Sequence, residues 1–444
     1  MTMAATPGPF VVMAKPVGPI CNLGCQYCYY LGKKDLFPAG ERYRMSDEVL
    51  EAYVRAFIAA SPGPVVHFVW HGGEPTLAGL DFYRRVVKFQ QRYLPDGWRC
   101  LNNLQTNGTL LDERWCTFIA REGFSVGLSI DGPASVHDLV RPDRRGRPTQ
   151  ARAMRGLRLL KEHGVDPDVL CTVNAYNAAK PLEVYRYFLD HDVRWVQFLP
   201  VVEREPDGQV GRHSVAPRAF GEFLVQIFDE WVRHDVARIG VQNFLEPLLV
   251  VSGQPPTLCV MAETCGLALA MEHDGSVYSC DHFVDQAHYL GNVLGSPPAP
   301  PGGPPEPAVP AASKLGSFVS SPKQLAFGAA KKQLLPQYCR QCPVLFLCNG
   351  GCQKDRLALS PTGEGGLNYL CEGYRAFYSH ALPYLRRMAG LSAAGHPVSA
   401  IMAQLESEER DERRRWASTG RNHPCPCGSG KKFKLCCLPR FSRG

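Results

Sequence analysis

The sequence predicts an α/β protein, because strand-like and helix-like segments alternate over much of its first half. Between residues 65 and 201, short runs rich in β-branched residues alternate with amphipathic segments. After about residue 240 this alternation is lost and cysteines become frequent. Repeated strand–helix units form a parallel sheet that is either doubly wound or closed into a full or partial barrel. We therefore expect an α/β domain followed by an irregular, cysteine-rich region.

The expected strands and helices follow one another in a regular order. The first strand is "VVHFVW" (65–70), a buried run, and the helix after it covers 80–94. Further strands are expected at 100–108, 124–132, 167–174 and 193–201, with helices at 110–123, 149–164 and 181–192 between them. In barrels, the side chains that carry out chemistry lie at the carboxyl ends of the strands. "HGGEP" (71–75), "TNG" (106–108) and "SIDGP" (129–133) fall at such ends.

The C-terminal part of the chain is more varied. Residues 295–313 are rich in proline, glycine and alanine and are expected to form no core of their own. Helices are expected at 381–390 and 400–416, and the charged run 406–415 is typical of a solvated helix face. A short basic segment with four cysteines, 421–440, follows.

Composition and charge exclude several classes of protein. The 444 residues are 45% hydrophobic and 20% charged, which is typical of a globular protein. No stretch approaches the roughly 20 apolar residues of a membrane helix, and Pro7, Pro9 and Lys15 interrupt the N-terminus, so no signal peptide is expected. The net charge of +7 is modest for this length, so nucleic-acid binding is not favoured. We expect a cytoplasmic protein with no membrane partner.

The 18 cysteines are the most informative feature of the composition. Fifteen of them fall into four groups, at 21–28, 259–280, 339–371 and 425–437, while Cys100, Cys116 and Cys171 stand apart and are interpreted as core residues. In a long chain without an export signal, clustered cysteines indicate metal ligation rather than disulfides.

The first group lies in "CNLGCQYCYY" (21–30), where Cys21, Cys25 and Cys28 follow a C-x3-C-x2-C spacing. Three thiolates can hold three irons of a 4Fe–4S cube and leave the fourth iron open to a small molecule. The alternative is a zinc site with a distant fourth ligand.

The cysteine spacing, with Tyr27 before the last cysteine, and the "GGEP", "TNG" and "SIDGP" segments in this order resemble the radical S-adenosylmethionine (SAM) superfamily. The resemblance implies a partial (β/α)6 barrel, SAM on the open iron, and a 5′-deoxyadenosyl radical that removes a hydrogen atom. It also implies that Gly72, Gly73 and Glu74 contact the SAM amino group, that Ser129 and Arg141 contact its carboxylate, and that Asn107 and Asp131 line the rest of its pocket. Tyr30 is expected to contact the substrate or the adenosyl group, with a packing role as the alternative.

The next eight grouped cysteines are enough for two fully ligated 4Fe–4S clusters, although taken alone they could also hold two zinc ions. Their block resembles the SPASM domain, an auxiliary-cluster extension of radical SAM enzymes that modify peptides. By that resemblance the inner cluster is held by Cys259, Cys265, Cys280 and Cys352, and the outer cluster by Cys339, Cys342, Cys348 and Cys371. Closed clusters of this kind indicate electron transfer.

The last cysteine group has a C-x-C-x8-C-C spacing in a basic loop, and it resembles the SEC-C zinc motif. Its ligands are Cys425, Cys427, Cys436 and Cys437. Zinc is favoured over a further Fe–S site or free thiols. The module is expected to be a tethered accessory whose partner, an unfolded polypeptide or the export machinery, the sequence does not establish.

Residues 8–380 as a whole resemble anaerobic sulfatase-maturating enzymes, through "CNLGCQYCYY", "HGGEPTLAGLDFY", "LQTNGTLLDERW", "VGLSIDGP", "DGSVYSCDHFV" and "CNGGC". Those enzymes oxidise a cysteine or serine in a C/S-x-P-x-R segment of a sulfatase to formylglycine. The implied partners are an unfolded or nascent sulfatase and a reduced flavodoxin- or ferredoxin-type electron donor.

The same resemblance makes Asp281, directly after Cys280, the proton acceptor. Burial in a low-dielectric pocket is expected to raise the pKa of this carboxyl toward the working range. The alternative is an aspartate that only orders the ligand loop.

These expectations divide the chain into a radical SAM partial barrel (8–240), a SPASM domain (241–380, with the insert 295–313), a helical linker (381–420) and a SEC-C motif (421–444). Two rival functions remain. One is a SPASM enzyme that forms a thioether or an epimer in a ribosomal peptide. The other is a non-enzymatic Fe–S electron-transfer or zinc scaffold.

Overall fold

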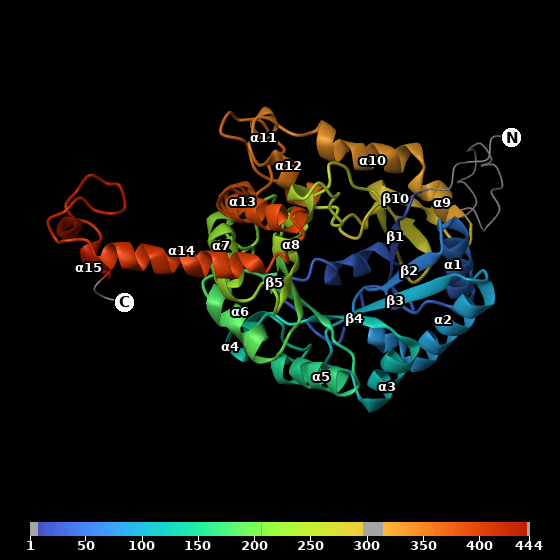
Figure 1. The fold of residues 1–444 in the computed structure, drawn as a ribbon. Helices are drawn as coiled ribbons and strands as arrows, with labels where there is room; N and C mark the ends of the chain where they lie inside the picture. The colour runs from blue at the N-terminus through green and yellow to red at the C-terminus, as the bar shows by residue number, and fades with distance from the viewer. Residues whose placement is uncertain (1–7, 206, 296–313, 442–444) are drawn as a thin grey trace.

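One ten-stranded sheet organises the computed structural model, which describes residues 8–205, 207–295 and 314–441 (Figure 1). The strand order is β10-β9-β8-β1-β2-β3-β4-β5-β6-β7. The strands are β1 (Val11–Ala14), β2 (Val65–Trp70), β3 (Arg99–Thr106), β4 (Ser125–Ser129), β5 (Asp168–Val173), β6 (Trp195–Pro200), β7 (Gly240–Val241), β8 (Ala268–Met271), β9 (Ser276–Tyr278) and β10 (Tyr289–Asn292). All neighbours from β8 to β7 are parallel, whereas β8–β9 and β9–β10 are antiparallel.

Helices follow the strands as the alternation predicts. The helices are α1 (Asp47–Ala60), α2 (Leu80–Tyr93), α3 (Glu113–Glu122), α4 (Ala134–Val140), α5 (Gln150–Glu162), α6 (Pro181–Asp190), α7 (Pro217–His234), α8 (Gln242–Val251), α9 (Lys314–Val319), α10 (Pro322–Gln333), α11 (Gln337–Arg340), α12 (Leu345–Cys348), α13 (Cys371–Ala393), α14 (Ala400–Ala417) and α15 (Leu438–Phe441). Local sequence sets their ends: the Asp112 side chain accepts a hydrogen bond from the Trp115 amide and begins α3, which Gly123 ends in a left-handed conformation. The predicted α/β class with a partial barrel is confirmed.

The sequence did not predict five of the strands, β1 and β7–β10, and of these β1 is central to the sheet. It pairs with β2 on one side and with β8 on the other. Its four residues are too few to show the alternation by which a strand is recognised. Through this pairing the cysteine-rich part of the chain joins the same sheet as the barrel.

Two hydrophobic cores cover the sheet. One packs α1, α2 and α3 against β1–β4, with Trp70 and Phe68 completely buried at its centre. The other packs β4–β7 against α5–α8 and also includes Leu385 of α13 and Ile401 of α14. The sheet and the second core therefore both continue past residue 240, where the first domain boundary was predicted. The division of the chain into domains stays a prediction.

Helix α14 leaves the body of the protein and carries the last segment at its end (Figure 1). Only Ile401 and Leu405 of this helix are buried. Near its middle, Arg233 Nε donates to Glu409 Oε1 at 3.0 Å. Almost all of the proline-rich insert, 296–313, lies outside the described residues. No helix named above is long and apolar enough to cross a membrane.

The contact between α7 and α13 generates a prediction about stability. A Cβ atom at Gly373 would lie 2.2 Å from the Pro217 carbonyl oxygen, which is backbone and cannot move aside. We expect Gly373→Ala to lower the free energy of unfolding by about 1–3 kcal/mol through overpacking. The matched control is Gly390→Ala in the same helix, where a Cβ meets nothing within 4 Å; the control should gain about 0.5–1 kcal/mol. Urea titration followed by circular dichroism compares the two, and equal midpoints would contradict the prediction.

Candidate functional site

The first three cysteines lie on a loop that follows β1 and is held in place by the segment after α4. The amides of Gly24 and Gln26 donate to the carbonyls of Pro142 and Val140, both at 2.9 Å. Leu23 forms an isolated bridge with Asp143. These backbone contacts present the thiols of the loop toward the carboxyl ends of the strands.

A metal that binds these thiols would have to displace their protons. Cys21, Cys25 and Cys28 interact electrostatically with one another. Burial raises the pKa of Cys21 to about 12 and that of Cys25 to about 11, although the Arg141 guanidinium counteracts part of the increase at Cys25. Thiols with such pKa values become thiolates at neutral pH only when a metal replaces the proton.

The spacing of the sulfur atoms distinguishes a single ion from a cluster. Tetrahedral zinc, with Zn–S bonds of about 2.3 Å, places its four sulfurs about 3.8 Å apart. In the described part of the chain, only one group of three or more potential ligand atoms lies within 4.8 Å of one another, and it is the C-terminal group Cys425, Cys427, Cys436 and Cys437. Within the described residues, no three ligand atoms of the other cysteine sets lie this close together, so these sets are more open than the C-terminal one.

Glycines let the loop after β2 pack directly on the cysteine loop. A Cβ atom at Gly73 would lie 2.0 Å from the Ile20 carbonyl oxygen, and Gly72 adopts a φ of 114°. The Gly73 amide donates to the carbonyl of Gly18 at 2.9 Å, and the Glu74 amide donates to that of Ile20 at 2.8 Å. Only glycine fits at such an approach of two backbones.

The Glu74 side chain, an expected contact of SAM, is buried and hydrogen-bonded within the protein. Its Oε1 accepts from the Thr76 amide and hydroxyl and from the Thr106 hydroxyl, and its Oε2 accepts from the Asn107 amide, at 2.6–3.0 Å. Because Oε2 accepts only one of these bonds, it can accept a further donor, and its contact with the SAM amino group stays a prediction. Glu74 also fixes the "GGEP" loop to the "TNG" loop.

Asp131 is also an internal anchor rather than a free pocket residue. It is fully buried, and its carboxylate accepts from the Tyr27 hydroxyl at 2.6 Å, from Arg141 Nε at 3.0 Å and from the Thr172 amide at 2.9 Å. The pair holds Arg141 close to Cys25. Asp131 thus positions Tyr27 and Arg141 beneath the cysteine loop.

Asn107 and Ser129 remain candidates for the SAM pocket. Asn107 Nδ2 donates to Asn22 Oδ1 at 2.9 Å and lies 3.8 Å from Cys21 Sγ. Ser129 ends β4, where its hydroxyl accepts from Gln105 Nε2 at 3.2 Å. Both residues lie at the carboxyl end of the sheet.

Asp281 is buried and forms an ion pair with Lys15, a side chain that is 0% exposed. The Tyr29 hydroxyl donates to the other carboxylate oxygen. The expectation of a raised pKa is wrong. Burial does raise the pKa of this carboxyl, but Lys15 and the neighbouring His71 and His282 outweigh it, so its pKa lies well below its ordinary value. The carboxylate is ionised at neutral pH and lies between the loop of Cys28 and the ligand position Cys280.

Tyr30 does not face an open pocket. It is only 3% exposed, its hydroxyl donates to Glu272 Oε1, and Lys15 Nζ lies 3.4 Å from the centre of its ring. The packing alternative therefore describes it better than a contact with substrate or SAM. Its role is to cover Lys15 and keep it close to Asp281.

Lys15, Tyr29 and Glu272 are site residues that sequence reasoning missed. Lys15 directly follows β1, and Glu272 directly follows β8. The position of a polar residue at the carboxyl end of a strand was the available signal, but β1 itself was not recognised. Glu272 also has one buried carboxylate oxygen, Oε2, without a hydrogen-bond partner in the described structure.

The eight middle cysteines form two separate groups. Cys280 interacts electrostatically with Cys352 and Cys259, and Cys259 interacts with Cys265. In the other group Cys371 interacts with Cys339, Cys342 and Cys348. The structure thus brings together the members of the expected inner set (259, 265, 280, 352) and those of the expected outer set (339, 342, 348, 371).

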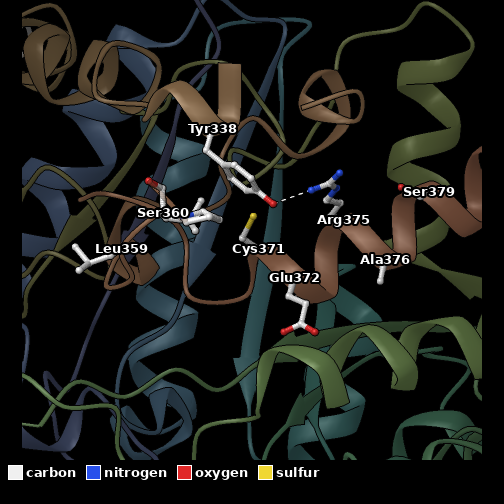
Figure 2. Close-up of a pocket in the computed structure, with 10 residues that line it drawn as sticks. Tyr338, Leu359, Ser360, Cys371, Glu372, Arg375, Ala376 and Ser379 are labelled. Atoms are coloured by element: carbon white, nitrogen blue, oxygen red, sulfur yellow. Dashed lines mark hydrogen bonds between the residues drawn. The ribbon is translucent and has the colours of Figure 1, made fainter. Parts of the chain in front are cut away.

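The outer set adjoins a surface groove of about 550 Å³. Figure 2 shows Cys371 at the start of α13, between Tyr338 and Glu372, with the Arg375 guanidinium donating to the Tyr338 hydroxyl at 2.7 Å. The Cys371 thiol is therefore the point at which the outer set comes closest to this groove.

A second cavity, of about 240 Å³, lies inside the barrel. Its polar lining includes His71, Gln105, Asp168 and Gln197. His71 also interacts electrostatically with Asp281. His71 therefore lies between this cavity and Asp281, which is not itself part of the cavity lining.

Comparisons with known proteins agree with this geometry. The model of the Radical SAM superfamily matches residues 16–188, and that of the SEC-C motif matches residues 421–439. The serine-type anaerobic sulfatase-maturating enzyme of Bacteroides thetaiotaomicron is 41% identical over 86% of this chain and 92% of that protein. The cysteine-type enzyme of Clostridium perfringens (strain 13) is 31% identical over 86% of this chain and 98% of that protein. Native anSMEcpe with bound AdoMet and Cp18Cys peptide matches with a TM-score of 0.74 at 31% identity, over 86% of this chain and 99% of that one.

The two kinds of cysteine set generate a prediction about metal content. We expect Cys436→Ser to remove zinc without lowering iron, because Cys436 Sγ lies 3.5 and 3.7 Å from two other sulfurs of a compact site. Cys25→Ser should lower iron and leave zinc unchanged. Elemental analysis of the anaerobically purified proteins measures both metals. Loss of iron in Cys436→Ser would contradict the assignment of the C-terminal group to zinc.

Proposed function

This chain belongs to the anaerobic sulfatase-maturating enzymes of the radical SAM superfamily, and from that premise we propose that it converts a serine of a sulfatase polypeptide to formylglycine. Serine is favoured over cysteine because the identity to the serine-type relative is 41%, against 31% for the cysteine-type relative. The single observation that supports the proposed chemistry best is the ionised Asp281 between the N-terminal and inner cysteine sets.

The cysteines and backbone groups at the carboxyl end of the sheet suit the cofactors of such a reaction. We assign one 4Fe–4S cluster with SAM to the N-terminal set and two auxiliary 4Fe–4S clusters to the inner and outer sets. When bound, these groups supply a carbon radical that removes a hydrogen atom and a site that accepts one electron. The proposed contacts of SAM are Gly72, Gly73, Glu74, Asn107, Ser129 and Arg141.

The remaining steps belong to side chains of this chain. Serine must lose a hydrogen atom from Cβ, a proton from its hydroxyl and one electron to become an aldehyde. Asp281 is the proposed acceptor of the proton. Its low pKa makes it a weak base toward an intact alcohol, but the hydroxyl becomes far more acidic once the Cβ hydrogen atom has been removed.

Lys15 and Tyr29 hold the acceptor in place. Lys15 keeps the Asp281 carboxylate ionised, and the Tyr29 hydroxyl fixes one of its oxygens. Because Lys15 is fully buried and Asp281 only 6% exposed, little water reaches the pair. The target side chain would enter the cavity beside His71.

The peptide substrate is proposed to be an unfolded or nascent sulfatase with a C/S-x-P-x-R segment, and the electron donor a reduced flavodoxin- or ferredoxin-type protein. The SEC-C module is proposed to hold zinc and to act as a tethered accessory. Its position at the end of α14, away from both cavities, supports a role outside the chemical step.

The proposed acceptor is tested by Asp281→Asn. We expect this variant to keep its iron content and its cleavage of SAM to 5′-deoxyadenosine, but to form product about 10²-fold more slowly or not at all, because general-base catalysis contributes about that factor. The assay is mass spectrometry of a peptide with an S-x-P-x-R segment, in which the product has lost the mass of two hydrogen atoms. A cysteine version of the peptide serves as the comparison. Unchanged product formation in Asp281→Asn would remove this residue from the mechanism.

A truncation tests the tethered role of the C-terminal module. Deletion of residues 418–444 should leave formylglycine formation on a short peptide within about twofold of the full chain, because it removes none of the residues of the two hydrophobic cores. Zinc content should fall to zero in the same protein. An inactive truncation with its iron intact would contradict the accessory role.

A further inference from the structure

Two cations lie close to the auxiliary cysteine sets: Lys331, which is buried, and Arg356, which is partly buried. Lys331 of α10 is 1% exposed, and its ammonium donates to the carbonyls of Cys259 at 2.7 Å and Val260 at 3.0 Å, and also to that of Ala262. The Arg356 guanidinium lies next to it and donates to the Lys331 carbonyl at 2.6 Å. Both side chains are thus fixed in position by backbone carbonyls.

Neither cation has a carboxylate partner. Within the described residues, no salt bridge joins Lys331 or Arg356 to an aspartate or glutamate, and Arg356 Nη1 is buried without a hydrogen-bond partner. The ionisable groups that face them are cysteine thiols, which carry charge only as thiolates. Lys331 interacts with Cys259, Cys265 and Cys352 of the inner set, while Arg356 interacts with Cys265 and Cys352 of the inner set and with Cys339 and Cys348 of the outer set.

Burial of an unpaired positive charge is costly, so such charges occur where an anion neutralises them. A 4Fe–4S cluster with four thiolates is an anion, and its negative charge grows by one when it accepts an electron. A fixed cation beside it stabilises the reduced form more than the oxidised form. Charge and hydrogen bonds around a cluster are among the factors that set its reduction potential.

We infer that Lys331 and Arg356 raise the reduction potentials of the auxiliary clusters, with Lys331 acting on the inner cluster and Arg356 on both. This inference rests on the proposed function, in which the inner and outer sets hold clusters that accept the electron released by the substrate. The two residues touch neither substrate nor SAM. They act through the clusters by making them better electron acceptors.

The neighbouring Lys332 offers a matched control. It is adjacent to Lys331 in sequence and on the same helix, but its side chain is 60% exposed and pairs with Glu263 at 2.6 Å on the surface. Solvent screens such a charge, so its effect on a buried cluster is small. Lys332→Gln therefore changes the same charge on the same helix without changing the environment of the clusters.

The test is a redox titration of the full-length holoenzyme, followed by electron paramagnetic resonance and without substrate. Addition of SAM changes the signal of the cluster that binds it and so identifies the N-terminal cluster. The other two redox couples are then assigned to the auxiliary clusters. We expect Lys331→Gln to make reduction of one auxiliary couple at least tenfold less favourable, a negative shift of about 59 mV for one electron. Arg356→Gln should shift both auxiliary couples, Lys331→Arg should restore the potential, and Lys332→Gln should shift neither.

Unchanged auxiliary potentials in variants that retain their iron would overturn the inference. If Lys331→Gln loses its inner cluster because its carbonyl contacts are lost, Arg356→Gln decides the question by the same measurement. Loss of clusters in both Gln variants would show that the two cations serve assembly only, and would also overturn it. The titration contains no substrate, so an error in the proposed substrate would not change these outcomes. If the unmodified enzyme showed no redox couples from auxiliary clusters, that result would instead count against the proposed function.

Discussion

The pairing of β1 with two strands at once is the constraint on which the rest of this structure depends. In register, Ala14 lies opposite Trp70 of β2 and opposite Met271 of β8. The next residue on each of these strands is Lys15, His71 and Glu272, and backbone hydrogen bonds from His71 to Ala14 and from Lys15 to Met271 extend the alignment by that residue. One short strand thus brings the cysteine loop, the glycine loop and the cysteine-rich region to a single place at the carboxyl edge of the sheet.

Burial of charge explains how that place is organised. Three buried ions in it are paired or hydrogen-bonded: Asp131 pairs with Arg141, Asp281 pairs with Lys15, and Glu74 accepts from four donors. Such pairs are costly to break because the remaining charge would be left unpaired in a low dielectric. The consequence for chemistry is that Asp281, the proposed proton acceptor, is already ionised and already oriented. The exceptions, Lys331 and Arg356, face thiols instead of carboxylates, which is consistent with anionic clusters as their partners.

The cysteines follow two different geometries that correspond to two different tasks. Eleven of them lie in open sets within the body of the protein, and four lie in a compact set at the end of α14. The compact set needs no core beyond its own short loop, since one ion can organise four thiolates. The open sets instead rely on α10, α13 and the sheet to bring together residues that are far apart in sequence, such as Cys259 and Cys352. The compact set is therefore separated in space from the open sets, at the far end of α14.

Local patterns in the sequence determined the strands β2–β6 and the helices α2, α3, α5 and α6 between them, and they determined less of the site. Alternation predicted β2 to its end residues, and cysteine spacing with the neighbouring "GGEP", "TNG" and "SIDGP" segments indicated both the reaction class and the compact C-terminal site, because these signals need only neighbouring residues. Only the tertiary structure decided the state of individual side chains. The pKa of Asp281 is set by Lys15, 266 positions earlier in the chain, and the carboxylate of Glu74 is occupied by donors from the next strand–loop unit. The electrostatic and hydrogen-bond partners of a side chain are often distant in sequence and are brought to it by the fold. A pattern along the chain can therefore identify a candidate site residue without revealing its charge state or its hydrogen-bond partners.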